Sequence, residues 1–89
     1  MYTIFRTTRF KKDYKKLSQT DKTHLKDVVK ILSEGKSLDN KYKDHKLIGN
    51  YLNCRECHLR PDVLLIYRIN QASIELALVR VASHSDLFN

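Results

Sequence analysis

Imidazole and carboxylate side chains that could transfer protons are concentrated in the second half of the chain. His45, His58 and His84 flank segments that we expect to be strands, and hairpin connections could bring them to one rim of a sheet. Asp62, next to a proline, could join them, although it also suits a turn. Imidazole and carboxylate groups act as general acids and bases near neutral pH. The residues alone therefore predict a proton-transfer site and leave a three-histidine metal site conceivable.

Glu56 and His58 lie two residues apart in a segment that we expect to be extended. Side chains two positions apart on a strand share one face. The charge of Glu56 would favour the protonated imidazolium of His58, which suits proton transfer. The alternative is an exposed charged pair on a sheet rim. The two predicted faces carry, respectively, Leu52, Cys54, Glu56 and His58, and Arg55, Cys57 and Leu59.

The stretch from Cys54 to His58 spells C-x-x-C-H, the spacing of a c-type haem attachment site. Haem attachment of this kind takes place outside the cytoplasm, and the chain begins without the pattern of a signal peptide. A strand would also point Cys54 and Cys57 to opposite faces, whereas a redox pair or a zinc site needs convergent sulfurs. Free thiols, with Cys57 in the core, are the simplest interpretation.

Hydrophobic periodicity predicts the elements that position these residues. Phe10, Tyr14 and Leu17 form one apolar stripe of a helix capped by Thr8, on which Asp13 would give only local charge relief to neighbouring lysines. A second helix follows the cap at 18–21, ends at Gly35, and carries His24 on its solvated face. The remaining expected elements are a strand at 2–7, a basic surface loop at 36–46, strands at 51–60, 63–70 and 73–82, and a C-terminal tail.

This order, β-α-α-β-β-β, predicts an α+β fold: a small, mainly antiparallel twisted sheet with a helical hairpin packed on one face. With 89 residues the chain forms a single domain, 1–89, too small for a separate cofactor domain. No apolar run is long enough for a membrane helix, so we expect a cytoplasmic protein. Residues 1–46 hold thirteen Lys and Arg against six Asp and Glu, which indicates a polyanion or an acidic protein as partner.

Three blocks of sequence resemble the YafQ branch of the RelE/ParE superfamily of type II toxins. Residues 42–49 (YKDHKLIG) are similar to its YKDHxLxG loop, and residues 55–67 to its R-[DE]-x-H-x-x-P-D-x-x-L-I-Y block. Residues 80–88 are similar to its R-x-x-[ST]-H-x-x-L-F ending. The blocks occur in the family's order and cover residues 42–88. The resemblance implies a RelE-like fold.

The resemblance also implies an mRNA endoribonuclease that acts on the translating 70S ribosome without a metal or another cofactor. The 2′-hydroxyl of the RNA would be the nucleophile and would leave 2′,3′-cyclic phosphate and 5′-hydroxyl ends. A cognate antitoxin, with a ribbon-helix-helix DNA-binding half, would silence the toxin. The complex would repress its own operon, and the toxin would meet DNA only through it.

The family's motifs assign roles to individual side chains of this sequence. His45, His58, Asp62 and His84 fall at catalytic positions, Glu56 at an acidic position and Phe88 at a terminal aromatic. We expect His84 as general acid, His58 with Glu56 as the base or the partner of the base, Asp62 orienting a histidine and Phe88 stacking on a nucleobase. The residues expected to hold phosphate or RNA are His45, Arg55, Arg80, Lys43, Lys46, Lys11, Lys12 and Lys15.

Two other functions fit parts of the sequence. A ParE-like toxin would share the fold and poison DNA gyrase, but chains of that kind generally lack the histidine set. A non-catalytic RNA-binding module would use only the basic face. Salt-sensitive binding fits both the RNA-binding module and the nuclease toxin, so cleavage of RNA is the observation that discriminates them.

Overall fold

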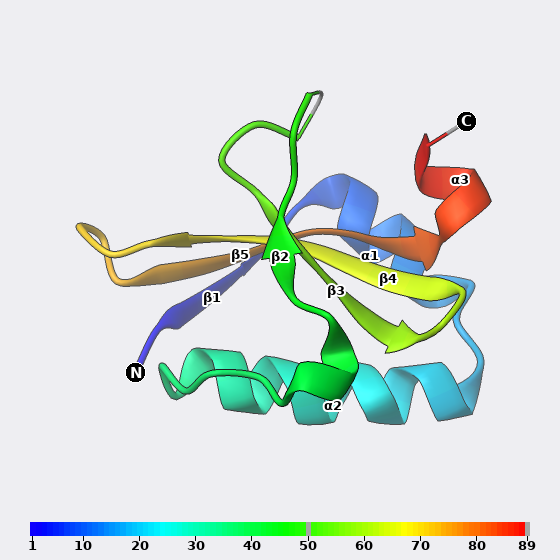
Figure 1. Cartoon of the computed structure of the whole chain (residues 1–89), viewed down its shortest axis with the longest axis horizontal. Coiled ribbons are helices and arrows are strands. Elements are labelled where there is room, and N and C mark those ends of the chain that lie inside the picture. Colours follow the sequence, from blue (N-terminus) through cyan, green and yellow to red (C-terminus); the bar gives the residue numbers. More distant parts are fainter. Residues whose placement is uncertain (50, 89) are drawn as a thin grey trace.

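The computed structural model describes residues 1–49 and 51–88, and within them it forms one five-stranded sheet flanked by helices (Figure 1). The strand order is β1-β5-β4-β3-β2. The elements are β1 (Thr3–Arg6), α1 (Thr8–Lys15), α2 (Gln19–Ser33), the 3₁₀ helix η1 (Asn40–Tyr42), β2 (His45–Lys46), β3 (Arg55–Arg60), β4 (Val63–Asn70), β5 (Glu75–Ser83) and α3 (His84–Phe88).

The sheet is mainly antiparallel, which confirms the predicted α+β class. Strands β2, β3, β4 and β5 pair antiparallel in sequence order, and β1 joins β5 in parallel. A parallel pair needs a long crossover, and the segment containing α1 and α2 supplies one between β1 and the later strands. The register of β4 against β5 shifts between Ile66 and Tyr67, where β5 carries Val79 as an extra residue.

Local hydrogen bonds explain where the two main helices begin. The Thr7 hydroxyl accepts the amide hydrogen of Phe10 at 3.0 Å, so Thr7, not Thr8 as expected, caps α1. Ser18 caps α2 in the same way by accepting from Asp21 N at 3.1 Å, as predicted. After α2 the chain turns at Gly35, whose φ of 76° lies in the left-handed region that favours glycine.

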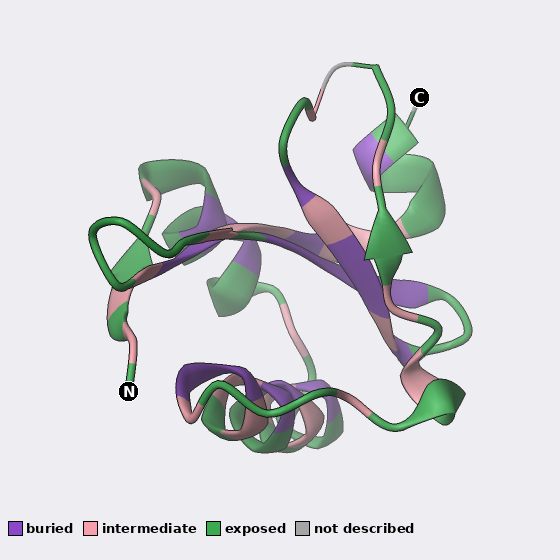
Figure 2. Cartoon of the chain, turned by 60° about the vertical axis from the view of Figure 1, so that its left-hand side comes forward, coloured by how far each residue is buried: buried purple, intermediate pink, exposed green. Residues whose placement is uncertain are grey.

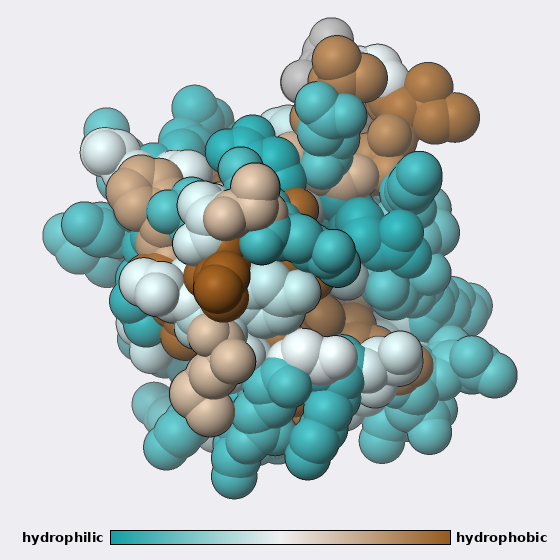
Figure 3. Space-filling model, turned by 90° about the vertical axis from the view of Figure 1, so that its left-hand side faces the viewer, coloured by the Kyte–Doolittle hydropathy of each residue, from teal (hydrophilic) through white to brown (hydrophobic). Residues whose placement is uncertain are grey.

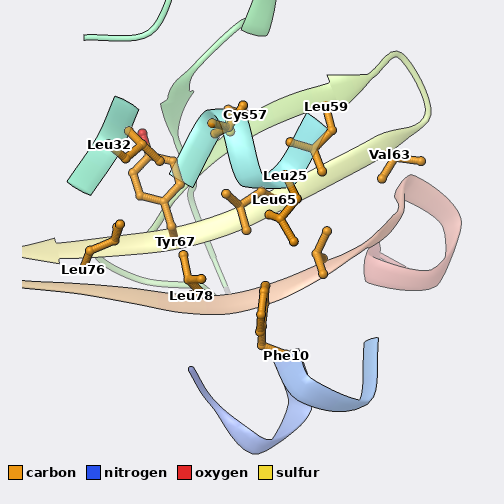
Figure 4. Packing of buried hydrophobic residues seen from close by; sticks show 12 residues of the cluster. Phe10, Leu25, Leu32, Cys57, Leu59, Val63, Leu65, Tyr67, Leu76 and Leu78 are labelled. Atoms are coloured by element: carbon orange, nitrogen blue, oxygen red, sulfur yellow. The ribbon is translucent and has the colours of Figure 1, made fainter. Parts of the chain in front are cut away.

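Each face of the sheet has its own apolar cluster. Figure 2 shows that the buried residues run along the central strands and along one side of α2. One face packs against Phe10 of α1 and against the stripe of Leu25, Val28 and Leu32 on α2. Figure 4 shows Phe10, Leu25 and Leu32 beside strand residues such as Tyr67 and Leu78. The opposite face, the second face of the sheet, carries a smaller cluster of Cys54, Leu64, Ile66 and Leu87. In Figure 1, α2 lies below the sheet, whereas α3 and the segment that links β2 to β3 rise above it.

Three segments differ from the sequence prediction. The expected loop at 36–46 contains η1 and the short strand β2, because a two-residue strand has no detectable periodicity. Residues 51–53 form a turn, and β3 starts only at Arg55. The expected tail folds into α3, which Leu87 anchors by burying its side chain against the second face.

Polar side chains cover most of the side seen in Figure 3, and hydrophobic atoms gather at its upper end. Ile48 and Leu52, in the segment between β2 and β3, expose 95% and 72% of their surface.

None of the helices in the described part of the chain is both long and apolar enough to span a membrane.

Candidate active site

A row of side chains crosses the second face of the sheet from β2 to β5. His45 pairs with Glu56, Glu56 with Ile66, and Ile66 with Arg80, on four successive strands. His58 begins a neighbouring row that continues through Leu64 and Ala82. Cross-strand partners share one face of a sheet, so His45, Glu56 and His58 emerge together, as the alternation predicted for the last two.

The Glu56 carboxylate lies between two imidazoles. Its Oε1 atom is 3.4 Å from Nε2 of His45 and 3.7 Å from Nε2 of His58. Glu56 is only 6% exposed, whereas the side chains of His45 and His58 are 54% and 23% exposed. A buried carboxylate requires compensating partners, and the two rings provide them at the boundary with solvent. His45, Glu56 and His58 form an imidazole cluster in which a buried carboxylate lies between two accessible rings.

The ring of His45 is held at both nitrogens. Its Nδ1 atom is 2.8 Å from the carbonyl oxygen of Lys43, and its Nε2 atom faces Glu56. A backbone carbonyl only accepts hydrogen bonds, so Nδ1 donates to it. The distance of 3.4 Å between Nε2 and Oε1 of Glu56 is short enough for an ion pair when the ring is protonated. This arrangement suits a cation that receives an anionic substrate.

A second group of possible site residues lies where β5 passes into α3. The His84 ring packs on Phe88 with 4.9 Å between centroids, and Phe88 meets Tyr51 edge-to-face at 6.1 Å. The backbone N–H of His84 donates to the carbonyl oxygen of Asp62 at 3.2 Å, which ties α3 to the β3–β4 turn. Asp62 is exposed and contacts His84 through its backbone; the predicted orienting role of its side chain stays a prediction.

The expected local role of Asp13 is wrong, because Asp13 is buried and binds Arg80 across the fold. Its carboxylate accepts from Nε and Nη2 of Arg80, both at 2.9 Å, and from the backbone N–H of Val81 at 3.2 Å. Strand β1 pairs with residues 75–78 of β5, so the Val81 amide lies beyond the end of β1. Asp13 of α1 accepts the hydrogen bond of this edge amide. The hydrogen bonds that Arg80 donates to Asp13 raise the pKa of its guanidinium, although burial acts in the opposite direction. The sequence carries a signal for this burial. Asp13 follows the core residue Phe10 by three positions, and residues i and i+3 of a helix lie on the same face.

Arg55 lies on the opposite face from Glu56, as strand alternation requires, and the structure does not bring it into the imidazole cluster. Its guanidinium contacts the Asp44 carboxylate at 3.2–3.3 Å, and the Tyr67 hydroxyl donates to the same carboxylate at 2.5 Å. Sequence reasoning missed both Asp44 and Tyr67. No local signal marked them, because Asp44 lies in a segment without strand periodicity and its partners Arg55 and Tyr67 are 11 and 23 residues away in the sequence.

The lysines expected to contact RNA occupy two separate places. Lys43 and Lys46 are exposed on either side of His45, and Lys43 adopts a left-handed conformation with φ 51°. The other three are exposed on α1, which packs against β5, three strands away from β2: Lys11, Lys12 and Lys15. The structure therefore separates a basic helix from the imidazole cluster.

The two cysteines are the remaining candidate ligands, and the sheet places them on opposite faces. Cys54 and Cys57 are free and buried in different clusters, as predicted from alternation. Burial raises the pKa of the Cys57 thiol to about 12. His24, expected to be solvated, is half-buried, and its Nδ1 atom has no hydrogen-bond partner among the described residues. Within residues 1–49 and 51–88, no three His, Cys, Asp and Glu side chains form a metal-binding group.

Comparison with known proteins places this geometry in a family. A family model described as a bacterial toxin of type II toxin-antitoxin systems, YafQ, matches residues 2–89. The mRNA interferase toxin YafQ of Escherichia coli is 36% identical over 47 residues, which are 53% of this chain and 49% of that protein. This chain thus aligns with about half the length of the curated relatives it matches.

Solved structures extend the similarity to the whole fold. A metal-bound toxin from Helicobacter pylori is 42% identical with a TM-score of 0.87, and the alignment covers 99% of this chain and 100% of that one. YafQ in the E. coli DinJ–YafQ toxin-antitoxin complex is 32% identical with a TM-score of 0.85, covering 99% and 98%. The matched model spans nearly the entire sequence, including β1 and α3. The chain belongs to the YafQ family of bacterial type II toxins.

Proposed function

We propose that this protein is a ribosome-dependent endoribonuclease that cleaves mRNA and thereby inhibits translation. The observation that carries the proposal is the buried Glu56 carboxylate between the accessible rings of His45 and His58. The proposal is supported by the similarity to a protein of E. coli named mRNA interferase toxin YafQ. Proton transfer is the chemistry that such a cluster provides, and RNA can supply its own nucleophile.

The reaction needs a base, an acid and a cation. His58, with its ring beside Glu56, takes the proton from the 2′-hydroxyl, and the 2′-oxygen attacks the adjacent phosphorus. His84 donates a proton to the departing 5′-oxygen as the P–O5′ bond breaks. The products are a 2′,3′-cyclic phosphate and a 5′-hydroxyl. The reaction requires no external nucleophile and no oxidant or reductant.

The placement of the two imidazoles suits an in-line displacement. The attacking and leaving oxygens lie on opposite sides of phosphorus, so base and acid must approach from different directions. His58 and Ala82 are in one cross-strand row, two strand spacings or roughly 10 Å apart at the backbone. His84 follows Ala82 by two residues. We therefore place the scissile phosphodiester between His58 and His84.

Charged and aromatic groups around the cluster would bind the RNA. The His45 imidazolium stabilises the charge that develops on the phosphorane, a role in which a preorganised cation lowers the barrier. Arg80 shares its row but already binds Asp13, so we assign it electrostatic support. Phe88 is 42% exposed and stacks on a base next to the scissile bond.

The proposed partners follow from charge and from the relatives. YafQ of E. coli has been solved in a complex with DinJ, and we propose a cognate antitoxin with a ribbon-helix-helix half for this toxin as well. Through that antitoxin the complex would bind operator DNA. The lysines of α1 would contact ribosomal RNA in the cytoplasm, away from the imidazole cluster.

Primer extension on a defined mRNA in a cell-free translation reaction tests this function. New 5′ ends should appear with the wild-type protein only while ribosomes translate. His84→Ala should remove them, whereas Ser85→Ala, an exposed neighbour in α3, should leave them unchanged. Circular dichroism confirms that each variant is folded. Absence of new ends with folded wild-type protein would refute the nuclease and favour gyrase poisoning or simple RNA binding.

A further inference from the structure

Strand β2 is too short to hold a side chain in place by itself. It contains only His45 and Lys46, at the edge of the sheet, and pairs with β3 at two positions. It also follows directly on the 3₁₀ helix η1 and the left-handed Lys43. A ring that is half-exposed on so short an edge strand needs a further constraint if its position is to be fixed.

That constraint lies at Asp44, on the opposite face. The carboxylate of Asp44 accepts hydrogen bonds from Arg55 at 3.2–3.3 Å and from the Tyr67 hydroxyl at 2.5 Å. Arg55 and Tyr67 are themselves register partners on β3 and β4. The residue just before His45 is thus attached to two neighbouring strands in the middle of the sheet.

Tyr67 connects this attachment to the core. Its ring is 1% exposed and lies beside Leu32 of α2, as Figure 4 shows. Burial and the hydrogen bond to Asp44 raise the pKa of the Tyr67 hydroxyl, so the phenol stays protonated and keeps donating. The bond to Asp44 likewise raises the pKa of Arg55. Both donors therefore keep their protons at neutral pH.

We propose that Asp44, Arg55 and Tyr67 form a positioning network that holds His45 against Glu56 from the other side of the sheet. The inference rests on the proposed function, because it gives His45 a role in RNA cleavage. None of the three residues needs to touch RNA. Arg55 acts through Asp44 instead of binding phosphate itself.

The first test removes one hydroxyl. Tyr67→Phe should slow single-turnover cleavage of ribosome-bound mRNA by roughly 10- to 100-fold, since small misplacements of a site residue have effects of this size. Tyr14→Phe, which deletes a hydroxyl from the exposed face of α1, is the matched control and should cleave normally. Both variants are compared at a temperature where circular dichroism shows them fully folded.

The decisive comparison repeats Tyr67→Phe in a His45→Ala background. If the network acts through His45, loss of the hydroxyl should slow His45→Ala by less than about 2-fold, because the ring it positions is gone. A hydroxyl that merely supported the fold would have the same effect in both backgrounds. Equal rate losses in the two backgrounds would overturn the proposal, as would a Tyr67→Phe variant that cleaves like wild type.

A readout independent of cleavage separates this inference from the proposed function. In protein carrying ¹⁵N-histidine, Tyr67→Phe should shift the ring-nitrogen NMR signals of His45 and leave those of His24 and His84 unchanged. If Tyr67→Phe shifts the His45 signals but the wild-type protein cuts no RNA, the network is supported and the nuclease is refuted. Unchanged His45 signals would refute the network whatever the activity.

Discussion

Removing the Asp13 carboxylate should destabilise the protein more than any exposed acidic side chain does. Asp13 is 7% exposed, and the Arg80 side chain that it binds through two hydrogen bonds is 12% exposed. In Asp13→Ala the guanidinium remains buried without its acceptors, and the Val81 amide also loses a hydrogen bond. Breaking a buried ion pair from one side costs about 3–5 kcal/mol in the free energy of unfolding.

This loss converts into a measurable shift in melting temperature. For 89 residues the entropy of unfolding is about 0.19 kcal/mol/K, so a loss of about 3 kcal/mol lowers the Tm by about 16 °C. Thermal unfolding followed by circular dichroism measures the shift. Asp27→Ala, at an exposed position of α2, is the control and should change the stability by less than about 0.5 kcal/mol.

A double-mutant cycle with Arg80→Met distinguishes the ion pair from simple loss of packing. The Asp13→Ala and Arg80→Met double variant should be more stable than the sum of the single effects predicts, because no unpaired charge then remains buried. Additive single effects, or a loss below about 1 kcal/mol in Asp13→Ala, would refute the reasoning that this pair closes the open edge of β5.

The remaining predictions concern acid stability and thiol chemistry. Hydrogen bonding to Arg60 lowers the pKa of Asp21 below its unfolded value near 3.9, so its stabilisation is present above that pH and is lost as the pH falls through the folded pKa. Asp21→Asn should therefore lower the Tm at pH 7 and weaken its dependence on pH in the acid range; equal curves for both proteins would contradict this. With a pKa of about 12, Cys57 holds roughly 10⁻⁴ of its thiol as thiolate at pH 8 and is fully buried, so iodoacetamide should label it in urea but not in the native protein. Rapid native labelling at Cys57, read by mass spectrometry, would contradict the packing.

Much of the architecture could be predicted because it depends on periodicity. The stripe of Leu25, Val28 and Leu32 predicts α2, and the long apolar runs of β4 and β5 predict the central sheet. Alternation also placed Glu56 with His58 and separated Cys54 from Cys57. These properties are encoded within a few residues, so the sequence alone reveals them.

What could not be predicted depends on contacts between distant residues. Strand β2 exists because His45 and Lys46 pair with Glu56 and Arg55, and no local signal marks so short a strand. The partners of Asp13 and Asp44 lie 67 and 23 residues away in sequence, at Arg80 and Tyr67. Helix α3 forms where the chain folds back over the second face, which a polar tail did not suggest.

The most direct test of the nuclease site is single-turnover cleavage of mRNA on programmed ribosomes by wild type and Glu56→Gln, which has the same shape without the charge. We expect the variant to be folded and slower by about 10²-fold or more, the usual contribution of a general acid–base group. Wild type should leave 2′,3′-cyclic phosphate ends, and Glu75→Gln on β5 should cleave normally. A Glu56→Gln variant that cleaves at the wild-type rate would contradict the assignment of the active site to this carboxylate and its two imidazoles.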